Sequence, residues 1–318
     1  MELIIQPNAP QQTQTNAVTT TLRINELIDA FINDSDVKPS SKRLYRRTLK
    51  QYFNFIERMN YNLNEVARAQ ILEYKDSLLN DGMSSLTVGS YITSVRQFYN
   101  WTEANKIYPN VAKGIKTPTR KQQFKKQPLT ALQAKHLLKH LEAQSLRDYA
   151  IINLLLRTGL RTIEATRANV NDITIKNGTR VLMIQGKGRD EKDNFVILTN
   201  KAYKPLEAYL NQRGRTNTNE PLFTSTSNNN KAGRLTTRTV SYIAKQGLKA
   251  IGLDANVYTA HSLRHTTAVN ILRAGGSLEM AQMTLRHTNP ATTQIYTSTL
   301  NEERRLQKNG ETLIDKLF

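Results

Sequence analysis

Residues 145–161 read SLRDYAIINLLLRTGLR, a stretch that places apolar side chains on nearly every face of a helix. A helix that is apolar all round is buried, so the pattern predicts a helix over residues 145–158 inside a domain core. Gly159 follows this helix and can adopt the left-handed conformation that ends one. The sequence therefore places Arg161 in a turn beside a buried helix.

The surroundings of this helix indicate a mixed domain. Another helix is predicted over residues 131–142, and two β-rich runs follow at residues 180–185 and 194–198. These runs flank the sequence Gly-Lys-Gly-Arg at 186–189, so they predict a hairpin. The rest is predicted to be helical, and we expect an α+β domain over residues 129–318.

The first part of the chain predicts a small helical bundle. Apolar stripes with helical spacing begin at Ile24, Leu44, Val66 and Tyr91, and Ser84 is well placed to cap the fourth helix. Four helices with short loops form a bundle, which we expect over residues 21–112. Residues 1–20 are rich in Gln, Thr, Asn and Pro and predict a disordered tail. The whole chain is thus expected to be mainly α with a small β component.

A basic segment at residues 113–128 separates the two predicted domains. It has no acidic residue and contains Pro118. Its cations are Lys113, Lys116, Arg120, Lys121, Lys125 and Lys126. We interpret the segment as an interdomain linker that can lie along a phosphate backbone, each phosphate contact adding salt-dependent affinity. A solvated spacer fits the same residues equally well.

Composition narrows the class of partner. The 45 Lys and Arg residues exceed the 26 Asp and Glu residues by 19, a charge that concentrates polyanions such as nucleic acid. Charge alone fits a ribosomal or merely solvated basic surface equally well. The chain has no cysteine, which excludes disulfides and fits a reducing cytoplasm. No apolar run is long enough to cross a bilayer, so we expect no membrane partner and a cytoplasmic protein.

A set of polar residues indicates chemistry on a phosphodiester. Its members are Arg161, Lys187, His261, Arg264, His287 and Tyr296. Arginine is permanently charged and can contact two phosphate oxygens, histidine can donate or accept a proton, and tyrosine can attack phosphorus. Each residue alone would more often be structural. Together they predict metal-free phosphoryl transfer with a covalent intermediate, in which Lys187 is the general acid and Lys192 competes for that role.

A metal site was the rival interpretation of the histidines. The chain has no cysteine, and no carboxylate cluster accompanies residues 261–287. His136 and His140 are four apart on a predicted helix but lack a third ligand. The sequence therefore predicts neither a metal nor another cofactor.

The order of these motifs resembles the tyrosine recombinases of the phage integrase family. The matching stretches are Thr158–Arg161 with Glu164, Gly186–Gly188, His261–Thr266, Gly275, Leu285–His287 and Thr292–Tyr296. The predicted bundle, notably residues 91–99 with Arg96, also resembles the helical core-binding, SAM-like domain of that family. The likeness covers nearly everything after Thr21.

The resemblance implies a role for each residue. Arg161, His261, Arg264 and His287 would bind the scissile phosphate, Lys187 would protonate the leaving group, and Tyr296 would form a 3′-phosphotyrosyl bond that releases a 5′-hydroxyl. Lys113 to Lys126 and Arg96 would contact DNA. The length resembles that of compact Xer-like or transposon-type enzymes acting on double-stranded DNA with inverted-repeat core sites.

Three departures from the family pattern stand out. Position 286 is arginine where the family usually has glycine, the hairpin after Gly188 is longer and more acidic, and Thr297 and Ser298 replace the basic or aromatic partner after the tyrosine. Two other functions stay open: a type IB topoisomerase-like DNA relaxing enzyme, and a noncatalytic DNA-binding regulator on the same scaffold.

The end of the chain bears on assembly. Leu313, Ile314, Leu317 and Phe318 form an apolar stripe on a predicted final helix. The pattern fits packing on its own domain or on a neighbour equally well. The resemblance favours a neighbour, and thus a homotetramer on two DNA duplexes, with a directionality factor as a further possible partner.

Overall fold

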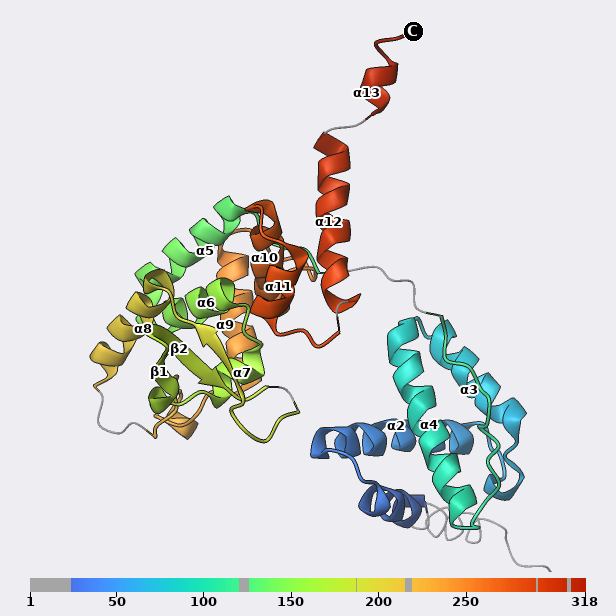
Figure 1. The fold of residues 1–318 in the computed structure, drawn as a ribbon. Coiled ribbons are helices and arrows are strands. Elements are labelled where there is room, and N and C mark those ends of the chain that lie inside the picture. Colours follow the sequence, from blue (N-terminus) through green and yellow to red (C-terminus); the bar gives the residue numbers. More distant parts are fainter. Residues whose placement is uncertain (1–23, 120–125, 187, 215–218, 290, 308–309) are drawn as a thin grey trace, which may run out of the picture. The chain divides into compact units, whose positions relative to one another are not determined.

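The computed structural model describes residues 24–119, 126–186, 188–214, 219–289, 291–307 and 310–318 (Figure 1). The chain forms two compact units, Met1–Gln122 and Gln123–Phe318. The division falls within the basic segment predicted as a linker. The predicted tail at residues 1–20 lies outside the described residues.

The first unit is a helical bundle built on aromatic packing. Helical residues 24–34 are followed by α2 (Pro39–Arg58), the 3-10 turn η1 (Leu63–Glu65), α3 (Arg68–Asn80) and α4 (Ser85–Ala104). The hydroxyl of Ser84 accepts the backbone N–H of Thr87, which confirms the predicted cap. Ile115 is buried in the core of this unit, so chain from the predicted linker packs against the bundle.

The second unit combines helices with a small sheet. Its elements are α5 (Ala131–Gln144), α6 (Leu146–Thr158), α7 (Thr162–Arg167), η2 (Val170–Asp172), β1 (Ile173–Lys176), β2 (Thr179–Ile184), β3 (Asn194–Ile197), α8 (Asn200–Arg213), η3 (Asn228–Asn230), α9 (Thr237–Ala250), α10 (Ala260–Arg273), α11 (Leu278–Leu285), α12 (Ala291–Gln307) and α13 (Glu311–Ile314). This architecture confirms the expected fold class, mainly helical with a minor β component.

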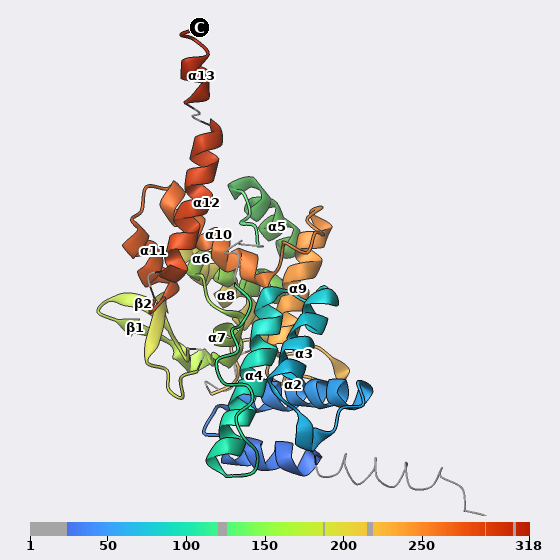
Figure 2. The ribbon, with the colours of Figure 1, turned by 90° about the vertical axis from the view of Figure 1, so that its right-hand side faces the viewer.

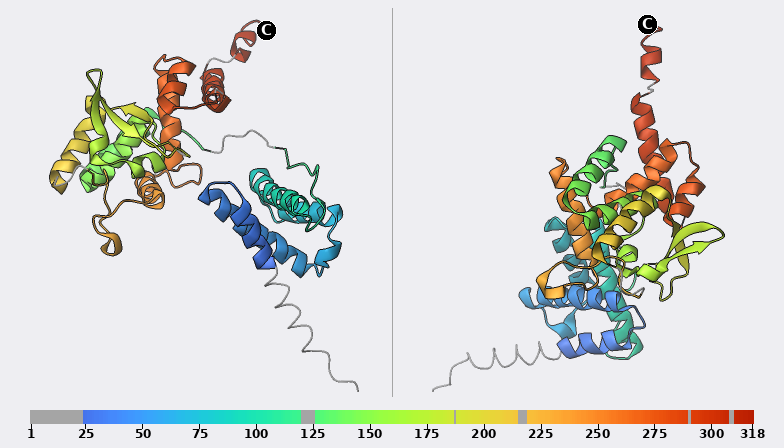
Figure 3. Two further views of the ribbon diagram at one scale, coloured as in Figure 1. Left: turned by 60° about the horizontal axis from the view of Figure 1, so that its bottom comes forward. Right: turned by 90° about the vertical axis from the view of Figure 1, so that its left-hand side faces the viewer.

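The sheet is antiparallel, in the order β1-β2-β3. Strands β2 and β3 form the predicted hairpin, with Leu182 opposite Val196. The first strand was not predicted. Its four residues, Ile-Thr-Ile-Lys, alternate apolar and polar side chains, but none is buried and the run is too short for periodicity to identify a strand. In Figure 3 the strands extend beyond the helices, which agrees with the exposure of β1.

Helix α6 is the centre of the second unit, as its sequence predicts. Ile151, Ile152 and Leu154 are completely buried, and α6 packs against α5, α8 and α10 (Figure 2). Gly159 ends the helix with φ of 60° and ψ of 25°, in the left-handed region. A Cβ at this position would lie 2.5 Å from Leu285 Cδ2. Glycine is needed here because the backbone is left-handed and because a Cβ would clash with Leu285. Its absence of a side chain lets the residues after α6 pack against the end of α11.

Helix α12 carries Tyr296 and packs beside α10 and α11 (Figure 1). It has 17 residues. The apolar stripe near the C-terminus is exposed, from 54% at Ile314 to 103% at Phe318. Helix α13 ends at Ile314, so Leu317 and Phe318 lie beyond the helix on which the stripe was predicted. Among the described residues, no helix is sufficiently long and apolar to span a bilayer.

Candidate active site

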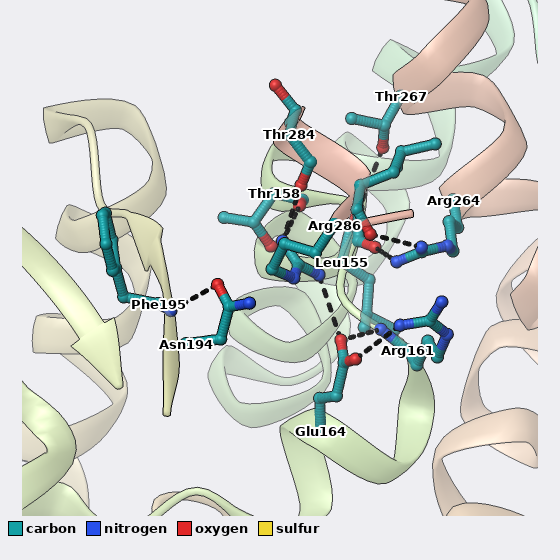
Figure 4. Close-up of polar contacts among 12 residues, drawn as sticks. Leu155, Thr158, Arg161, Glu164, Asn194, Phe195, Arg264, Thr267, Thr284 and Arg286 are labelled. Carbon is teal, nitrogen blue, oxygen red and sulfur yellow. Dashed lines mark hydrogen bonds and ion pairs between the residues drawn. The ribbon is translucent and has the colours of Figure 1, made fainter. Parts of the chain in front are cut away.

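Arg161 lies where sequence analysis placed it, in the turn after α6. It is the residue before α7, and its side chain is 31% exposed. Its backbone N–H and its guanidinium NH1 each donate to the Glu164 carboxylate, both at 2.8 Å (Figure 4). The carboxylate therefore orients Arg161 while leaving part of the guanidinium open to solvent.

Glu164 is the buried anion of the site. Its side chain is 1% exposed, and its second oxygen lies 3.0 Å from NH2 of Arg286. Burial opposes ionisation, but the charge of Arg286 and the hydrogen bonds from Arg161 outweigh it and lower the pKa of Glu164. Glu164 is therefore an anion held between two guanidinium groups.

Arg264 is the most deeply buried cation, with only 2% of the residue exposed. Its guanidinium donates to the carbonyls of Gly159 and Leu285, which joins the ends of α6 and α11 to α10. Burial, together with the charges of Arg161 and Arg286, lowers the pKa of Arg264 to about 9. It therefore remains charged at neutral pH, and two backbone carbonyls hold this cation in place.

His261 lies one helical turn before Arg264 on α10 and is exposed. Partial desolvation and the charges of Arg264 and Arg161 lower its pKa. His261, Arg161 and Arg264 line one open pocket of about 820 Å³ against α9. Three of the predicted phosphate-binding residues thus share a single surface.

Tyr296 is 3% exposed and lies between two histidines. Its ring is edge-on to His265, with centroids 4.8 Å apart, and stacks on His287 at 6.1 Å and 19°. His287 Nδ1 lies 2.9 Å from Thr293 Oγ1, which fixes the imidazole plane. Burial lowers the pKa of both histidines to about 4, so both are neutral near pH 7.

Opposing effects act on the Tyr296 hydroxyl. Burial raises its pKa, while the charges of Arg264 and Arg161 lower it. This coupling means that the phenol lies within the field of both arginines. Tyr296, His287, Arg264 and Arg161 therefore form one electrostatic group.

The two candidate general acids are Lys187 and Lys192. Lys187 lies outside the described residues. Lys192 donates to both oxygens of Asp172, at 2.7 and 2.6 Å, and Asp172 is buried. This ion pair ties the loop between β2 and β3 to η2 and occupies the Lys192 ammonium group.

The predicted DNA contacts are only partly described. Lys113, Lys116 and Arg96 are exposed, and Lys126 donates to the carbonyl of Asn256 at 2.7 Å. Arg120, Lys121 and Lys125 lie outside the described residues. Within the part of the chain that the structure describes, there is no group of three His, Cys, Asp or Glu side chains arranged to hold a metal ion.

Sequence reasoning missed several members of the site. His265 contacts Tyr296 and Thr293 contacts His287, but neither was given a role. Arg286 was expected either to add a phosphate contact or to alter the approach to His287, and its side chain instead pairs with Glu164. The signal for His265 was its spacing on α10, four residues after His261. Nothing in the sequence indicates that the Arg286 side chain turns inward.

Comparison with known proteins agrees with this geometry. The model of the Phage integrase family matches residues 127–303, more than half of the chain. The tyrosine recombinase XerD of Vibrio cholerae is 25% identical over 298 residues, covering 90% of this chain and 94% of the relative. XerC of Leptospira interrogans is 28% identical over 291 residues, covering 88% and 91%. The chain therefore belongs to the phage integrase family.

Solved structures share the fold at lower identity. A lambda integrase dimer bound to a COC′ core site aligns with a TM-score of 0.69 and 16% identity, covering 86% of this chain and 76% of that one. XerH in a post-cleavage complex with palindromic difH aligns at 0.67 and 20%, covering 84% and 78%. With the family assigned, the protein is a site-specific tyrosine recombinase, an enzyme of DNA strand cleavage and rejoining.

Proposed function

We propose that this recombinase cleaves DNA through a 3′-phosphotyrosyl intermediate formed by Tyr296. The observation that carries the proposal is the placement of the Tyr296 phenol between His265 and His287 and within the field of Arg161 and Arg264. A nucleophile needs a nearby base and cations for the charge that develops on the phosphoryl oxygens. This environment supplies both.

Residues of the site can accept and donate each proton that the cleavage step moves. The Tyr296 oxygen bonds to phosphorus as the bond to the 5′ oxygen breaks, and a neutral histidine accepts the phenol proton. His287 is our candidate, since its ring stacks on that of Tyr296. The cations Arg161 and Arg264, with His261 as a donor, stabilise the nonbridging oxygens. Lys187 protonates the departing 5′ oxygen, and the pairing of Lys192 with Asp172 favours Lys187 over Lys192.

Rejoining then exchanges strands between duplexes. A 5′-hydroxyl from a partner strand attacks the phosphotyrosine, restores Tyr296 and produces a Holliday junction. The similar structures bound to DNA, XerH on palindromic difH and the lambda integrase dimer on its COC′ core site, support double-stranded DNA with inverted-repeat core sites as the substrate. The result would be integration or excision of a mobile element or resolution of DNA multimers, with a directionality factor as a possible partner.

An exposed apolar surface supports the proposal that the protein assembles as a homotetramer on two duplexes. A groove of about 1000 Å³ lies along β3 and α11 in the second unit. Its exposed apolar lining consists of Phe195, Ile197, Met280 and Met283. The C-terminal stripe, with Leu317 and Phe318, is equally exposed. We propose that the stripe of one subunit fills the groove of the next. His287 also lines this groove.

The direct test is covalent capture on a suicide substrate, a nicked core site that loses its 5′-hydroxyl strand after cleavage. Wild-type protein should accumulate a covalent DNA adduct, and Tyr296→Phe should bind the same DNA without forming one. An adduct with Tyr296→Phe would contradict the assignment of the nucleophile. Absence of an adduct with the wild type would favour the noncatalytic regulator.

Strand exchange separates recombination from relaxation of DNA. Two synthetic duplexes carrying the core site should yield a Holliday junction with the wild type. A type IB topoisomerase-like enzyme rejoins the same strand, so relaxation of supercoils without any junction would favour that alternative.

A further inference from the structure

Arg286 occupies a backbone position that suits glycine. It follows α11 with φ of 56° and ψ of 47°, in the left-handed region. Side chains with a Cβ adopt this conformation rarely, and a helix commonly ends on glycine there. A long charged side chain at such a position calls for a compensating interaction.

The Arg286 side chain turns inward rather than into solvent (Figure 4). It is 8% exposed, and its NH2 lies 3.0 Å from the Glu164 carboxylate. Its NH1 donates to the carbonyl of Thr284 at 2.6 Å. Arg286 thus places a second cation on the buried anion that already orients Arg161.

The two arginines differ in access to solvent. The Arg161 side chain is 31% exposed and that of Arg286 is 8% exposed, while Glu164 between them is 1% exposed. A buried carboxylate that loses its only cation carries a large desolvation penalty. With Arg161 as its sole partner, Glu164 would hold that guanidinium back from any other anion.

We propose that Arg286 is a positioning residue: it neutralises Glu164 independently, so that Arg161 turns its guanidinium to the scissile phosphate without leaving the carboxylate unpaired. The inference rests on the proposed function, in which Arg161 binds that phosphate. In this proposal Arg286 affects the rate of cleavage indirectly. It acts through Glu164 and Arg161 and does not itself contact the reacting atoms.

The test is a double-mutant cycle of Arg286→Gly and Glu164→Gln, measured as single-turnover cleavage of the suicide substrate at saturating DNA. Arg286→Gly keeps the backbone conformation and should slow cleavage by up to about 10²-fold, as expected for a misplaced catalytic group. DNA affinity should stay near that of the wild type. Arg286→Lys should recover part of the rate.

The decisive arm is the double variant. Glu164→Gln removes the buried charge, so Glu164→Gln/Arg286→Gly should cleave faster than Arg286→Gly alone. A double variant as slow as Arg286→Gly, or slower, would overturn the proposal, as would Arg286→Gly that cleaves at the wild-type rate. Lys106→Gly is a matched control, because Lys106 has the same φ of 56° and lies in the first unit; its cleavage rate should be unchanged.

A second measurement does not depend on activity. The Glu164 carboxyl can be followed by carbon NMR during a pH titration of the full chain without DNA. Loss of the Arg286 cation should move the titration midpoint of Glu164 upward in Arg286→Gly, and an unchanged midpoint would overturn the proposal. A failure of the nucleophile assignment would appear separately, in the Tyr296→Phe experiment.

Discussion

Two buried tyrosines, one in each unit, have very different surroundings. Tyr52 is completely buried among aromatic rings, with Tyr74 and Tyr99 at 5.1 and 6.2 Å, and its hydroxyl lies 2.9 Å from that of Tyr99. Tyr296 is buried almost as fully, at 3% exposed, but its neighbours are histidines and arginines. Burial alone therefore does not separate a structural tyrosine from a candidate nucleophile, whereas the charge around it does.

The pKa values express this contrast. Burial, then the charges and hydrogen bond of neighbouring tyrosines, raise the pKa of Tyr52 well above its ordinary value. Burial also raises the pKa of Tyr296, but Arg264 and Arg161 oppose it. Removing these charges should make the second site resemble the first.

Apart from loss of the nucleophile itself, the largest expected effect follows from removing either arginine. Arg161→Ala and Arg264→Ala should each slow single-turnover cleavage by about 10²- to 10³-fold, because the transition state loses a preorganised donor. Arg147→Ala, which removes a cation paired with Asp148 in the same unit, is the control. Normal cleavage by Arg161→Ala would remove Arg161 from the site.

A smaller effect should appear in stability against pH. The pKa of His265 is about 4 in the folded chain against 6.5 ordinarily, so between these values the unfolded state binds a proton that the folded state does not. The contribution of His265 to the free energy of unfolding is therefore fully present above pH 6.5. It decreases by about 3 kcal/mol as the pH falls toward 4.

Thermal unfolding at pH 7 and pH 4.5 measures this dependence. The drop in Tm should be smaller in His265→Gln than in the wild type. The exposed His136 provides the control, and His136→Gln should keep the wild-type drop. An equal drop in the wild type and in His265→Gln would show that His265 titrates freely in the folded state.

The smallest effect concerns the structural tyrosine. Tyr52→Phe removes the buried hydrogen bond between the hydroxyl groups of Tyr52 and Tyr99, and should lower the free energy of unfolding by about 1 kcal/mol. Covalent adduct formation at saturating DNA should be unchanged. A loss of adduct comparable to that of Tyr296→Phe would break the distinction between the two tyrosines.

Local patterns in the sequence predict much of the fold. Ser84 and Gly159 act through their own neighbours along the chain, so their capping roles can be deduced without tertiary structure. The helical burial of α6 follows from its apolar composition. In contrast, β1 is short and exposed, and only its pairing with β2 defines it.

The candidate site likewise has features that local sequence predicts and features that depend on tertiary structure. The spacing of His261 and Arg264 places them together on α10, and the likeness to a known family connects them with distant residues. The inward turn of Arg286 could not be predicted, because its partner Glu164 lies 122 residues away in the chain. Pairing of Lys192 with Asp172 is similarly a product of tertiary structure.

The central claim is that Tyr296, and no other of the 13 tyrosines, becomes covalently joined to DNA. The most direct measurement is mass spectrometry of the protease-digested suicide-substrate adduct, after the DNA has been trimmed to a short remnant. The account predicts a single modified peptide, with Tyr296 carrying the 3′-phosphate of the cleaved strand. A remnant on another residue, or a 5′-phosphate linkage to Tyr296, would contradict it.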